Sequence, residues 1–350
     1  FINRATQGYP PASTIKPFIG LLGLEEKVIN RYTKIWDPGW YQLNGLERKY
    51  RDWKKWGHGE VNLSKAIEES CNVYFYDLAF KLGIDKMSNL LGQFGFGDYT
   101  GVDIHEERKG ILPSRAWKRN RYNQPWYTGE TLSVGIGQSY FTATPIQLAQ
   151  ALSILVNKGE IKVPHLLMRT KQVITTVAND KTASAETAKK GSKADGQNNL
   201  PFAFEPIINE VTKLDKNVIN EDIPYDEKPP IELTNDNNWD LILDAMHKTA
   251  QRSGATAYRA FKGSKYDVSG KTGSAQVAGI KQDEKYDAKK TRENKRDNAM
   301  FISFAPYEKP EIIVVVAIEN VEKGGGASNA APVARQMMDQ YFGNRVITST

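Results

Sequence analysis

The spacing of apolar positions predicts helices through the first half of the chain and again near its end. Asn62 is a suitable N-cap for one helix, and Asp85 is a suitable N-cap for a later one. Thr144-Pro145 places a capping residue before a proline at the first helical position, which is typical of a helix start. The expected helices cover residues 63–69, 73–82, 85–95, 146–158, 238–251 and 331–341.

Strand patterns gather in the second half of the chain. Runs rich in β-branched residues predict strands at 267–277, 300–305 and 312–318, with a turn at 307–310 between the last two. Helices followed by adjacent strands and a final helix indicate an α+β fold, in which helices flank an antiparallel sheet.

One stretch departs from these patterns. Residues 178–199 consist almost entirely of small and polar residues, so their burial cannot offset the entropy lost on ordering. We therefore expect a mobile polar insertion at about residues 171–237, within a single domain at residues 1–350. A domain boundary is the alternative, but the segments on either side each lack a complete set of strands and helices.

Composition and charge narrow the class of protein. The 350 residues are 40% hydrophobic and 25% charged, as in globular chains, and the single cysteine, Cys71, excludes an intrachain disulfide framework. The net charge of +6 is spread along the chain without a recognition module, so no nucleic-acid partner is expected. No apolar run reaches the roughly 18 residues of a membrane span. Because the chain starts at Phe1, we expect it to be part of a larger anchored protein.

Ser13-Thr14-Ile15-Lys16 follows two prolines, which suits the start of a helix. There, Ser13 and Lys16 lie on one helix face, one turn apart. A serine nucleophile needs a base within hydrogen-bond reach, and a lysine whose pKa is lowered by burial or nearby positive charge can serve. Taken alone, the pattern is common by chance, and a solvated helix start explains it better.

Two further motifs carry hydroxyl, amide and amino groups. Lys271-Thr272-Gly273-Ser274 lies in a predicted strand, where a lysine beside two hydroxyls suits a carboxylate and glycine permits close backbone approach. Ser70-Cys71-Asn72 lies between two predicted helices, where a short corner aims a hydroxyl and an amide at one site. Each motif is weak evidence alone. The first could be an edge strand with a protective lysine, and the second could be a pair of helix-capping residues.

The order of the three motifs changes this assessment. S-x-x-K near the start, then S-x-N, then K-T-G is the pattern of active-site serine penicillin-recognising enzymes. The chain resembles the transpeptidase domain of penicillin-binding proteins, most closely the elongation-specific class B group of Gram-negative bacteria. The resemblance covers nearly the whole chain except the polar insertion, and the stretches that add to it are residues 4–11, 37–40, 50–59 and 134–138.

The resemblance implies the fold shared by these proteins and serine β-lactamases, with the N-terminal strands largely missing. It also implies that Ser13 attacks the carbonyl between the two terminal D-alanines of a peptidoglycan stem peptide. Lys16 would take the serine proton, while Ser70 and Asn72 would relay protons and hold the substrate amide. The acyl-enzyme on Ser13 would then pass to an amine of a second stem peptide, and a β-lactam would be trapped at the same step.

The K-T-G motif would handle the substrate's terminal carboxylate in the same scheme. Lys271 and Thr272 would steer that carboxylate, with Gly273 beside them, and the backbone N–H groups of Ser13 and Ser274 would form the oxyanion hole. The implied partners are stem peptides, β-lactams and a membrane-bound glycosyltransferase of the elongation complex. The implied location is the periplasmic face of the inner membrane, and the implied role is in cell elongation and shape.

Two other functions stay open on the same scaffold. A D,D-carboxypeptidase or β-lactamase would need a positioned base and water for deacylation, and Glu130 is the one tempting acid near a motif. A non-catalytic domain would be acylated by penicillin only as a signal.

Cys71 also suggests a metal. Asp37, Asp52 and His58 lie in a Trp- and Gly-rich stretch between the first two motifs, and with Cys71 they make a plausible tetrahedral structural zinc site. The alternative is a buried apolar cysteine, an exposed histidine and turn-capping aspartates, with Asp103 and Glu60 as competing ligands. The chemistry itself is expected to require no cofactor.

Overall fold

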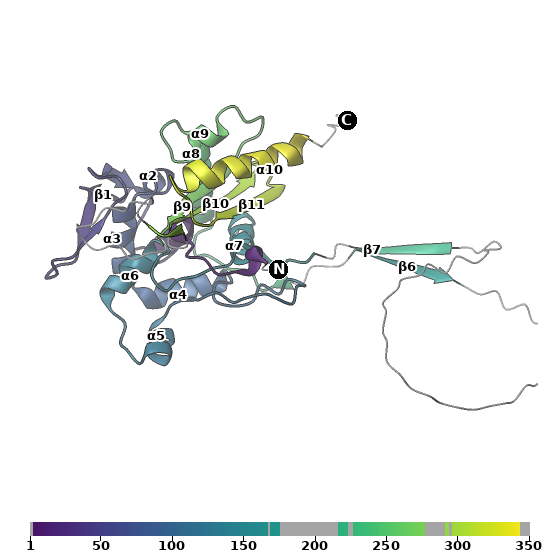
Figure 1. Ribbon diagram of the computed structural model, residues 1–350, viewed down its shortest axis with the longest axis horizontal. Helices are drawn as coiled ribbons and strands as arrows, with labels where there is room; N and C mark the ends of the chain where they lie inside the picture. The colour runs from purple at the N-terminus through teal and green to yellow at the C-terminus, as the bar shows by residue number, and fades with distance from the viewer. Residues whose placement is uncertain are drawn as a thin grey trace, which may run out of the picture. The chain divides into compact units, whose positions relative to one another are not determined.

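The computed structural model describes residues 3–166, 169–175, 216–222, 227–276, 291–293 and 296–343 (Figure 1). The chain divides into two compact units, one of Phe1–Leu166 with Tyr225–Thr350 and one of Leu167–Pro224. In the second unit, β6 (Arg169–Thr175) and β7 (Lys216–Asp222) pair antiparallel. Much of the expected polar insertion, residues 176–215 and 223–226, lies outside the described residues.

A three-stranded antiparallel sheet forms the centre of the first unit, in the order β11-β10-β9. Its strands are β9 (Ser269–Ala275), β10 (Asn298–Ala305) and β11 (Ile312–Ile318), which confirms the three expected strands. Among the described residues β9 pairs on one side only, so its other edge is available to different contacts.

Both faces of the sheet are covered, because successive side chains of a strand point to opposite sides. Phe301 of β10 belongs to a core cluster with Met338 of α10 (Ala331–Gly343), the helix that crosses the sheet in Figure 1. Its neighbours Met300 and Ile302 join the larger cluster formed with the helices of the first half of the chain. The expected antiparallel sheet flanked by helices is therefore confirmed.

The predicted helices begin and end largely where the sequence places them, whereas the helices at Arg115–Tyr122, Thr128–Gly135 and Tyr258–Phe261 were not predicted. Asn62 Oδ1 accepts from Lys65 N at 3.0 Å, and Thr144 and Gln147 form a reciprocal capping box. Asp85 is a correction, because it lies in the first turn of its helix and Gly83 occupies the N-cap. Besides α10, the helices of the described residues are α1 (Lys16–Glu25), α2 (Leu63–Glu68), α3 (Asn72–Leu82), α4 (Ile84–Gln93), α5 (Arg115–Tyr122), α6 (Thr128–Gly135), α7 (Pro145–Val156), α8 (Asn237–Gln251) and α9 (Tyr258–Phe261).

Several short elements were not predicted. The Trp-rich stretch between the first two motifs forms two small antiparallel pairs, and a third pair lies where the second unit leaves and rejoins the first. Strands of two to four residues carry too few positions for an alternating pattern to stand out. These pairs are β1 (Lys34–Asp37) with β4 (Gly59–Asn62), β2 (Trp40–Gln42) with β3 (Lys49–Arg51), and β5 (Ile161–Lys162) with β8 (Glu227–Lys228).

The N-terminal segment and the hydropathy of the helices were also part of the expectations. Residues 3–33 contain no strand of the sheet, only the 3₁₀ turns η1 (Arg4–Thr6) and η2 (Ala12–Ile15) before and at the start of α1. Within the part of the chain that is described, no helix combines the length and the hydropathy needed to cross a membrane.

Candidate active site

The S-x-x-K motif lies at a junction between two helical segments. Ser13 is in η2, which continues directly into α1 at Lys16, and the Lys16 N–H donates to the Ser13 carbonyl. Ala12, at φ 50°, donates its N–H to the Gly137 carbonyl at 2.8 Å, which anchors this turn. As a result Ser13 is half-buried at the surface of a cleft, while Lys16 lies completely buried one turn later.

The Lys16 ammonium joins the first motif to the second. Its Nζ donates to the Ser70 carbonyl at 2.8 Å, to Asn72 Oδ1 at 2.7 Å and to Ser70 Oγ at 3.3 Å. Burial lowers the pKa of Lys16 to about 8, although the negative charges of Asp52 and Asp37 act in the opposite direction. This amine therefore loses its proton far more readily than a solvent-exposed lysine.

The S-x-N motif is a tight corner between α2 and α3. Ser70 adopts φ 58°, in the left-handed region, and Cys71 caps α3 by accepting from Tyr74 N at 3.4 Å. Asn72 then occupies the first position of α3. The corner thus directs Ser70 Oγ and the Asn72 amide toward the Lys16 amine, as the two hydrogen bonds to that amine demonstrate.

The K-T-G motif lies on the free edge of β9. Thr272, Gly273 and Ser274 line the cleft, whereas Lys271 is fully buried, with its Nζ donating to the Thr272 carbonyl at 3.1 Å. Burial, followed by the positive charge of Lys16, holds the pKa of Lys271 well below its usual range. The influence of Lys16 on this pKa reflects the proximity of the two amines.

Gly273 is the point where β9 meets the turn that bears Ser13. A Cβ at this position would lie 3.1 Å from Thr14 Cγ2, 3.2 Å from Met300 Cβ and 3.3 Å from the Pro11 carbonyl oxygen. A side chain here would require these neighbours to shift by a few tenths of an ångström, so the close approach of β9 to the turn favours glycine.

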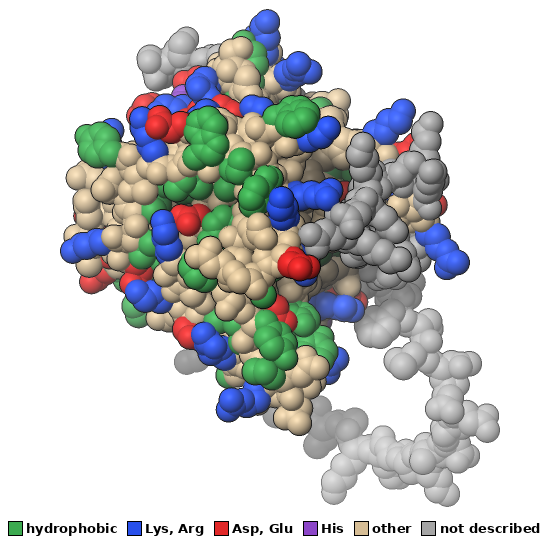
Figure 2. Space-filling model, turned by 90° about the vertical axis from the view of Figure 1, so that its left-hand side faces the viewer, with side chains coloured by type: hydrophobic (Ala, Val, Ile, Leu, Met, Phe, Trp, Pro, Cys, Tyr) green, Lys and Arg blue, Asp and Glu red, His purple; other side chains and the backbone are tan. Residues whose placement is uncertain are grey.

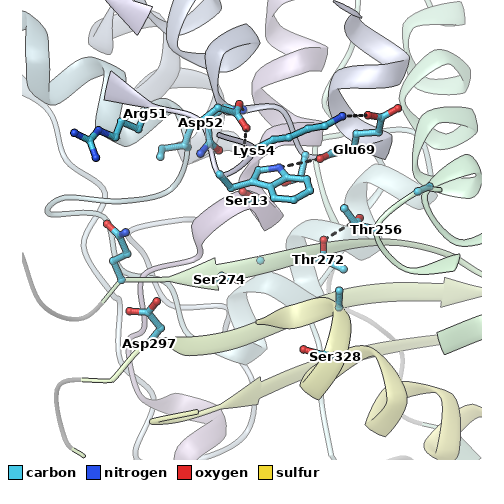
Figure 3. Close-up of a pocket in the computed structure, with 18 of the residues that line it drawn as sticks. Ser13, Arg51, Asp52, Lys54, Glu69, Thr256, Thr272, Ser274, Asp297 and Ser328 are labelled. Carbon is cyan, nitrogen blue, oxygen red and sulfur yellow. Dashed lines mark hydrogen bonds and ion pairs between the residues drawn. The ribbon is translucent and has the colours of Figure 1, made fainter. Parts of the chain in front are cut away.

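The three motifs surround one cleft of about 1580 Å³, shown in Figure 3. The figure shows Ser13 facing the β9 edge that carries Thr272 and Ser274. Lys16 and Lys271 lie below the cleft surface with no solvent exposure. The predicted site residues that line the cleft are Ser13, Asp52, Ser70, Asn72, Thr272, Gly273 and Ser274.

Two further residues of the cleft were not among the predicted site residues, although one of them, Gln138, lies in the stretch 134–138 that supports the family resemblance. Thr256, in the turn between α8 and α9, bonds Thr272 through a 3.0 Å contact of their hydroxyl oxygens. Gln138 Nε2 donates to the Ser274 carbonyl at 3.3 Å. Thr256 sits in an ordinary polar turn without a motif, so only the tertiary fold identifies it.

Glu130, the acid considered for a hydrolytic mechanism, is engaged elsewhere. Its carboxylate forms a 2.5 Å ion pair with the buried Lys118 and also accepts from the Tyr140 hydroxyl at 3.1 Å. Glu130 is absent from the residues that line the cleft.

The four residues considered for zinc form a buried cluster beside the S-x-N corner. One ligand atom from each of Asp37, Asp52, His58 and Cys71 can be chosen so that all lie within 4.8 Å of one another. His58 Nδ1 is 2.7 Å from Asp37 Oδ2 and 3.5 Å from Asp52 Oδ1, and Cys71 Sγ is 3.3 Å from Asp37 Oδ2. His58 is buried, unlike the exposed histidine of the alternative interpretation.

Backbone N–H groups fix both carboxylates of this cluster. Asp37 Oδ1 accepts from Gly39 N at 2.7 Å, and Asp52 Oδ2 accepts from Asn72 N at 2.6 Å. The second of these bonds attaches the Trp-rich stretch to the first residue of α3. The two competing acids lie elsewhere, because Glu60 pairs with Lys34 at an exposed site and Asp103 accepts from Leu166 N.

Comparison with known proteins agrees with this geometry. Residues 1–339 match the family described as "Penicillin binding protein transpeptidase domain". The chain is 41% identical over 342 residues to the peptidoglycan D,D-transpeptidase MrdA of Escherichia coli K12, covering 97% of this chain and 47% of that protein. It is 39% identical to MrdA of Haemophilus influenzae over 98% of this chain and 46% of that protein, so it spans about half the length of these relatives.

Solved structures share the fold. Pseudomonas aeruginosa PBP2 in complex with WCK 5153 superposes with a TM-score of 0.73 at 36% identity, over 97% of this chain and 62% of that one. The Helicobacter pylori complex of PBP2 with MreC gives a TM-score of 0.73 at 29% identity, over 98% of this chain and 51% of that one. These matches confirm the family and fold implied by the three motifs: the chain belongs to the penicillin-binding protein transpeptidase family.

Proposed function

We propose that this chain is a peptidoglycan D,D-transpeptidase domain that acts through an acyl-enzyme on Ser13. The observation that carries the proposal is the Lys16 amine, which is fully buried, bonded to Ser70 and Asn72, and lowered in pKa to about 8. Such an amine can be neutral near physiological pH, which a general base for a serine hydroxyl requires.

Acylation begins when neutral Lys16 takes the proton of Ser13 Oγ. The oxygen forms a bond to the carbonyl carbon between the two terminal D-alanines, and the Ser13 and Ser274 N–H groups stabilise the oxyanion. The carbon–nitrogen bond then breaks, and the departing D-alanine amine receives the proton from Lys16 through Ser70. An ester between Ser13 and the stem peptide remains.

Transfer reverses the same proton path. An amine of a second stem peptide attacks the ester carbon and loses a proton through Ser70 and Lys16. The ester bond breaks, Ser13 regains its proton, and a new amide cross-links the two peptides. During acylation the Thr272 and Ser274 hydroxyls hold the donor's terminal carboxylate and the charge of Lys271 favours its binding, and this carboxylate then leaves with the released D-alanine.

Covalent labelling tests the nucleophile. The wild-type chain incubated with a penicillin should gain the mass of one penicilloyl group, and Ser13→Ala should gain none. Ser253→Ala is the matched control, because Ser253 also lines the cleft but belongs to none of the motifs, and it should label normally. Equal labelling of Ser13→Ala and wild type would overturn the assignment.

The lifetime of that adduct separates transfer from hydrolysis. A transpeptidase should hold the penicilloyl group for minutes or longer, whereas a β-lactamase or carboxypeptidase would release it within seconds. The ion pair of Glu130 with Lys118 and the position of Glu130 outside the cleft favour the long-lived adduct, since Glu130 is then unable to activate water at the ester. Transfer of a stem-peptide acyl group to a D-amino acid then distinguishes an enzyme from a domain that only senses penicillin.

We also propose that Asp37, Asp52, His58 and Cys71 hold a structural zinc ion. The donor set of one thiolate, one imidazole and two carboxylates suits zinc, and all four side chains are buried with their ligand atoms close together. Backbone N–H groups already orient both carboxylates, as the surroundings of metal ligands usually do. With four protein ligands the ion would stabilise the loop against the S-x-N corner and take no part in acyl transfer.

Elemental analysis tests the zinc proposal. Protein purified without chelator should contain about one zinc per chain, and His58→Ala should lose most of it. His105→Ala is the control, because His105 is exposed and outside the cluster. A wild-type content below about 0.2 zinc per chain would contradict the proposal of a structural zinc site.

The proposed partners follow from the proposed reaction. Stem peptides carry carboxylates, and exposed cations line the cleft on two sides, at Arg48, Lys49 and Lys54 and at Arg259 and Lys262. The match to the penicillin-binding protein family supports β-lactam sensitivity. A role in cell elongation, action at the periplasmic face of the inner membrane and a membrane-bound glycosyltransferase partner are proposed from the resemblance described for the three motifs. The Helicobacter pylori structure is a complex of PBP2 with MreC, which supports a protein partner for this chain as well.

A further inference from the structure

The Thr256 hydroxyl occupies a position between two of the motifs. Its Oγ1 lies 3.0 Å from Thr272 Oγ1 in the K-T-G strand and 3.2 Å from the carbonyl oxygen of Glu68, two residues before the S-x-N motif. Thr256 N also donates to that carbonyl, at 3.1 Å. Both threonines line the cleft, and Figure 3 shows their side chains meeting across it.

The Glu68 carbonyl is held firmly in place. The Glu68 side chain is buried, accepts from the Ser64 hydroxyl at 2.5 Å and pairs with Arg252 at 2.5 Å. Arg252 reaches on to Glu69 at 2.9 Å, so the end of α2 has little freedom to move. Thr256 therefore bonds to a fixed point.

The number of protons decides the direction of these bonds. A carbonyl oxygen can only accept, so the single hydroxyl proton of Thr256 points to Glu68. Thr256 Oγ1 must then accept from Thr272, which commits the Thr272 proton to Thr256. In the unliganded protein, Thr272 presents only lone pairs to the cleft, and lone pairs repel a carboxylate.

Binding of a carboxylate requires the opposite arrangement. Thr272 must turn its proton toward the carboxylate oxygen, which leaves its own oxygen as an acceptor. Thr256 can then rotate its hydroxyl from Glu68 to Thr272, because the Glu68 carbonyl retains the Thr256 N–H. No buried group loses its last partner, and a donor to Thr272 Oγ1 polarises its O–H and strengthens the bond to the carboxylate.

We propose that Thr256 is a positioning residue for carboxylate recognition, whose hydroxyl switches from Glu68 to Thr272 when the substrate carboxylate binds. This inference rests on the proposed function, in which Thr272 holds that carboxylate. It adds a residue outside the three motifs to the recognition of the donor substrate. It also gives a reason why Thr256 contacts both the K-T-G strand and the end of α2.

The test compares acylation by a penicillin with acylation by its methyl ester, which lacks the negative charge. The measured quantity is the ratio of the two second-order rate constants in the full chain. Thr256→Val keeps the shape but removes the hydroxyl, and it should lower the ratio about five- to tenfold, as expected for a hydrogen bond that supports a charged contact. Thr256→Ser keeps the hydroxyl and should stay within about twofold of wild type.

A purely structural role of Thr256 would slow both substrates equally, which would overturn the inference, as would an unchanged ratio or a serine variant that behaves like valine. Thr256→Ala serves under the same criteria if the valine variant does not fold. Wild-type protein that shows no preference for the carboxylate would instead refute the proposed role of Thr272. A wild-type preference that Thr256→Val retains would refute only the inference about Thr256.

Discussion

Two lysine amines lie together in the protein interior, a costly arrangement for two positive charges. Lys16 is compensated by three acceptors and by the nearby carboxylates of Asp52 and Asp37, and burial lowers its pKa to about 8. Lys271 Nζ donates to the Thr272 carbonyl, and burial and the charge of Lys16 hold the pKa of Lys271 well below its usual range. At the scale of single residues, the site therefore contains a buried amine with a pKa of about 8 that is bonded to Ser70 and Asn72.

The titration of Lys16 predicts the pH dependence of acylation. Only the neutral amine accepts the Ser13 proton, so the rate should rise about tenfold per pH unit below its pKa and level off above about 8. Stopped-flow measurement with a fluorescent penicillin between about pH 6 and 9.5 covers this range. A rate that stays constant over the range would contradict the role of Lys16 as the base.

A control for this profile comes from the same position. Lys16→Met removes the titrating amine but keeps an apolar chain in the buried site. It should acylate at least about a hundredfold more slowly, the lower end of the usual contribution of a general base. Its residual rate should also lose the rise toward pH 8.

At the scale of elements, the site depends on how closely β9 approaches the turn before α1. A Cβ added at Gly273 would lie 3.1 to 3.3 Å from three heavy atoms of other residues, and two of these atoms belong to the segment around Ser13. The distance from Ser13 to the Ser274 N–H, the second proposed donor of the oxyanion hole, is therefore set by a residue without a side chain.

Gly273→Ala should separate these two elements. We expect a loss of about 1–3 kcal/mol in stability from overpacking and a fall in penicillin acylation, because the two oxyanion donors move apart. Thermal unfolding and labelling kinetics measure the two effects. Gly343→Ala is the matched control, since nothing lies within 4 Å of the added methyl group and both quantities should stay unchanged. Normal acylation by Gly273→Ala would show that the close approach is not needed.

At the scale of the whole molecule, all the site residues belong to one compact unit, Phe1–Leu166 with Tyr225–Thr350. The unit Leu167–Pro224 is inserted between β5 and β8, which pair with each other, Ile161 opposite Lys228 and Lys162 opposite Glu227. The chain thus leaves and re-enters the first unit at neighbouring points, as expected for an insertion that the rest of the fold does not need.

This topology predicts that the insertion is dispensable for acylation. Replacement of residues 167–224 by a short Gly-Ser linker should leave the rate of Ser13 labelling within about twofold of the full chain, because no site residue is removed and the β5–β8 pair remains. Labelling kinetics and thermal unfolding measure the outcome. A shortened chain that folds but no longer labels would assign the insertion a role in the site.

Local sequence patterns were sufficient to predict many of the helices and strands of this protein. The caps at Asn62 and Thr144 and the apolar runs of β10 and β11 identified their elements, because these signals act over a few neighbouring residues. The short pairs β1–β4 and β2–β3 carry no such signal and form through contacts with the rest of the unit. The one misplaced cap, Asp85, is the second residue of a helix that starts at Ile84 with Gly83 as its N-cap.

The candidate site divides in the same way. The sequence predicted the proposed nucleophile, lysines and hydroxyls, because the order of three short motifs is specific even though each motif alone is common. The depth of burial that lowers the pKa of Lys16, the closeness of Asp37, Asp52, His58 and Cys71, and the bond between Thr256 and Thr272 depend on segments far apart in the chain. Only the tertiary structure decides them, because desolvation and hydrogen-bond geometry are properties of the packed fold and not of any local stretch of residues.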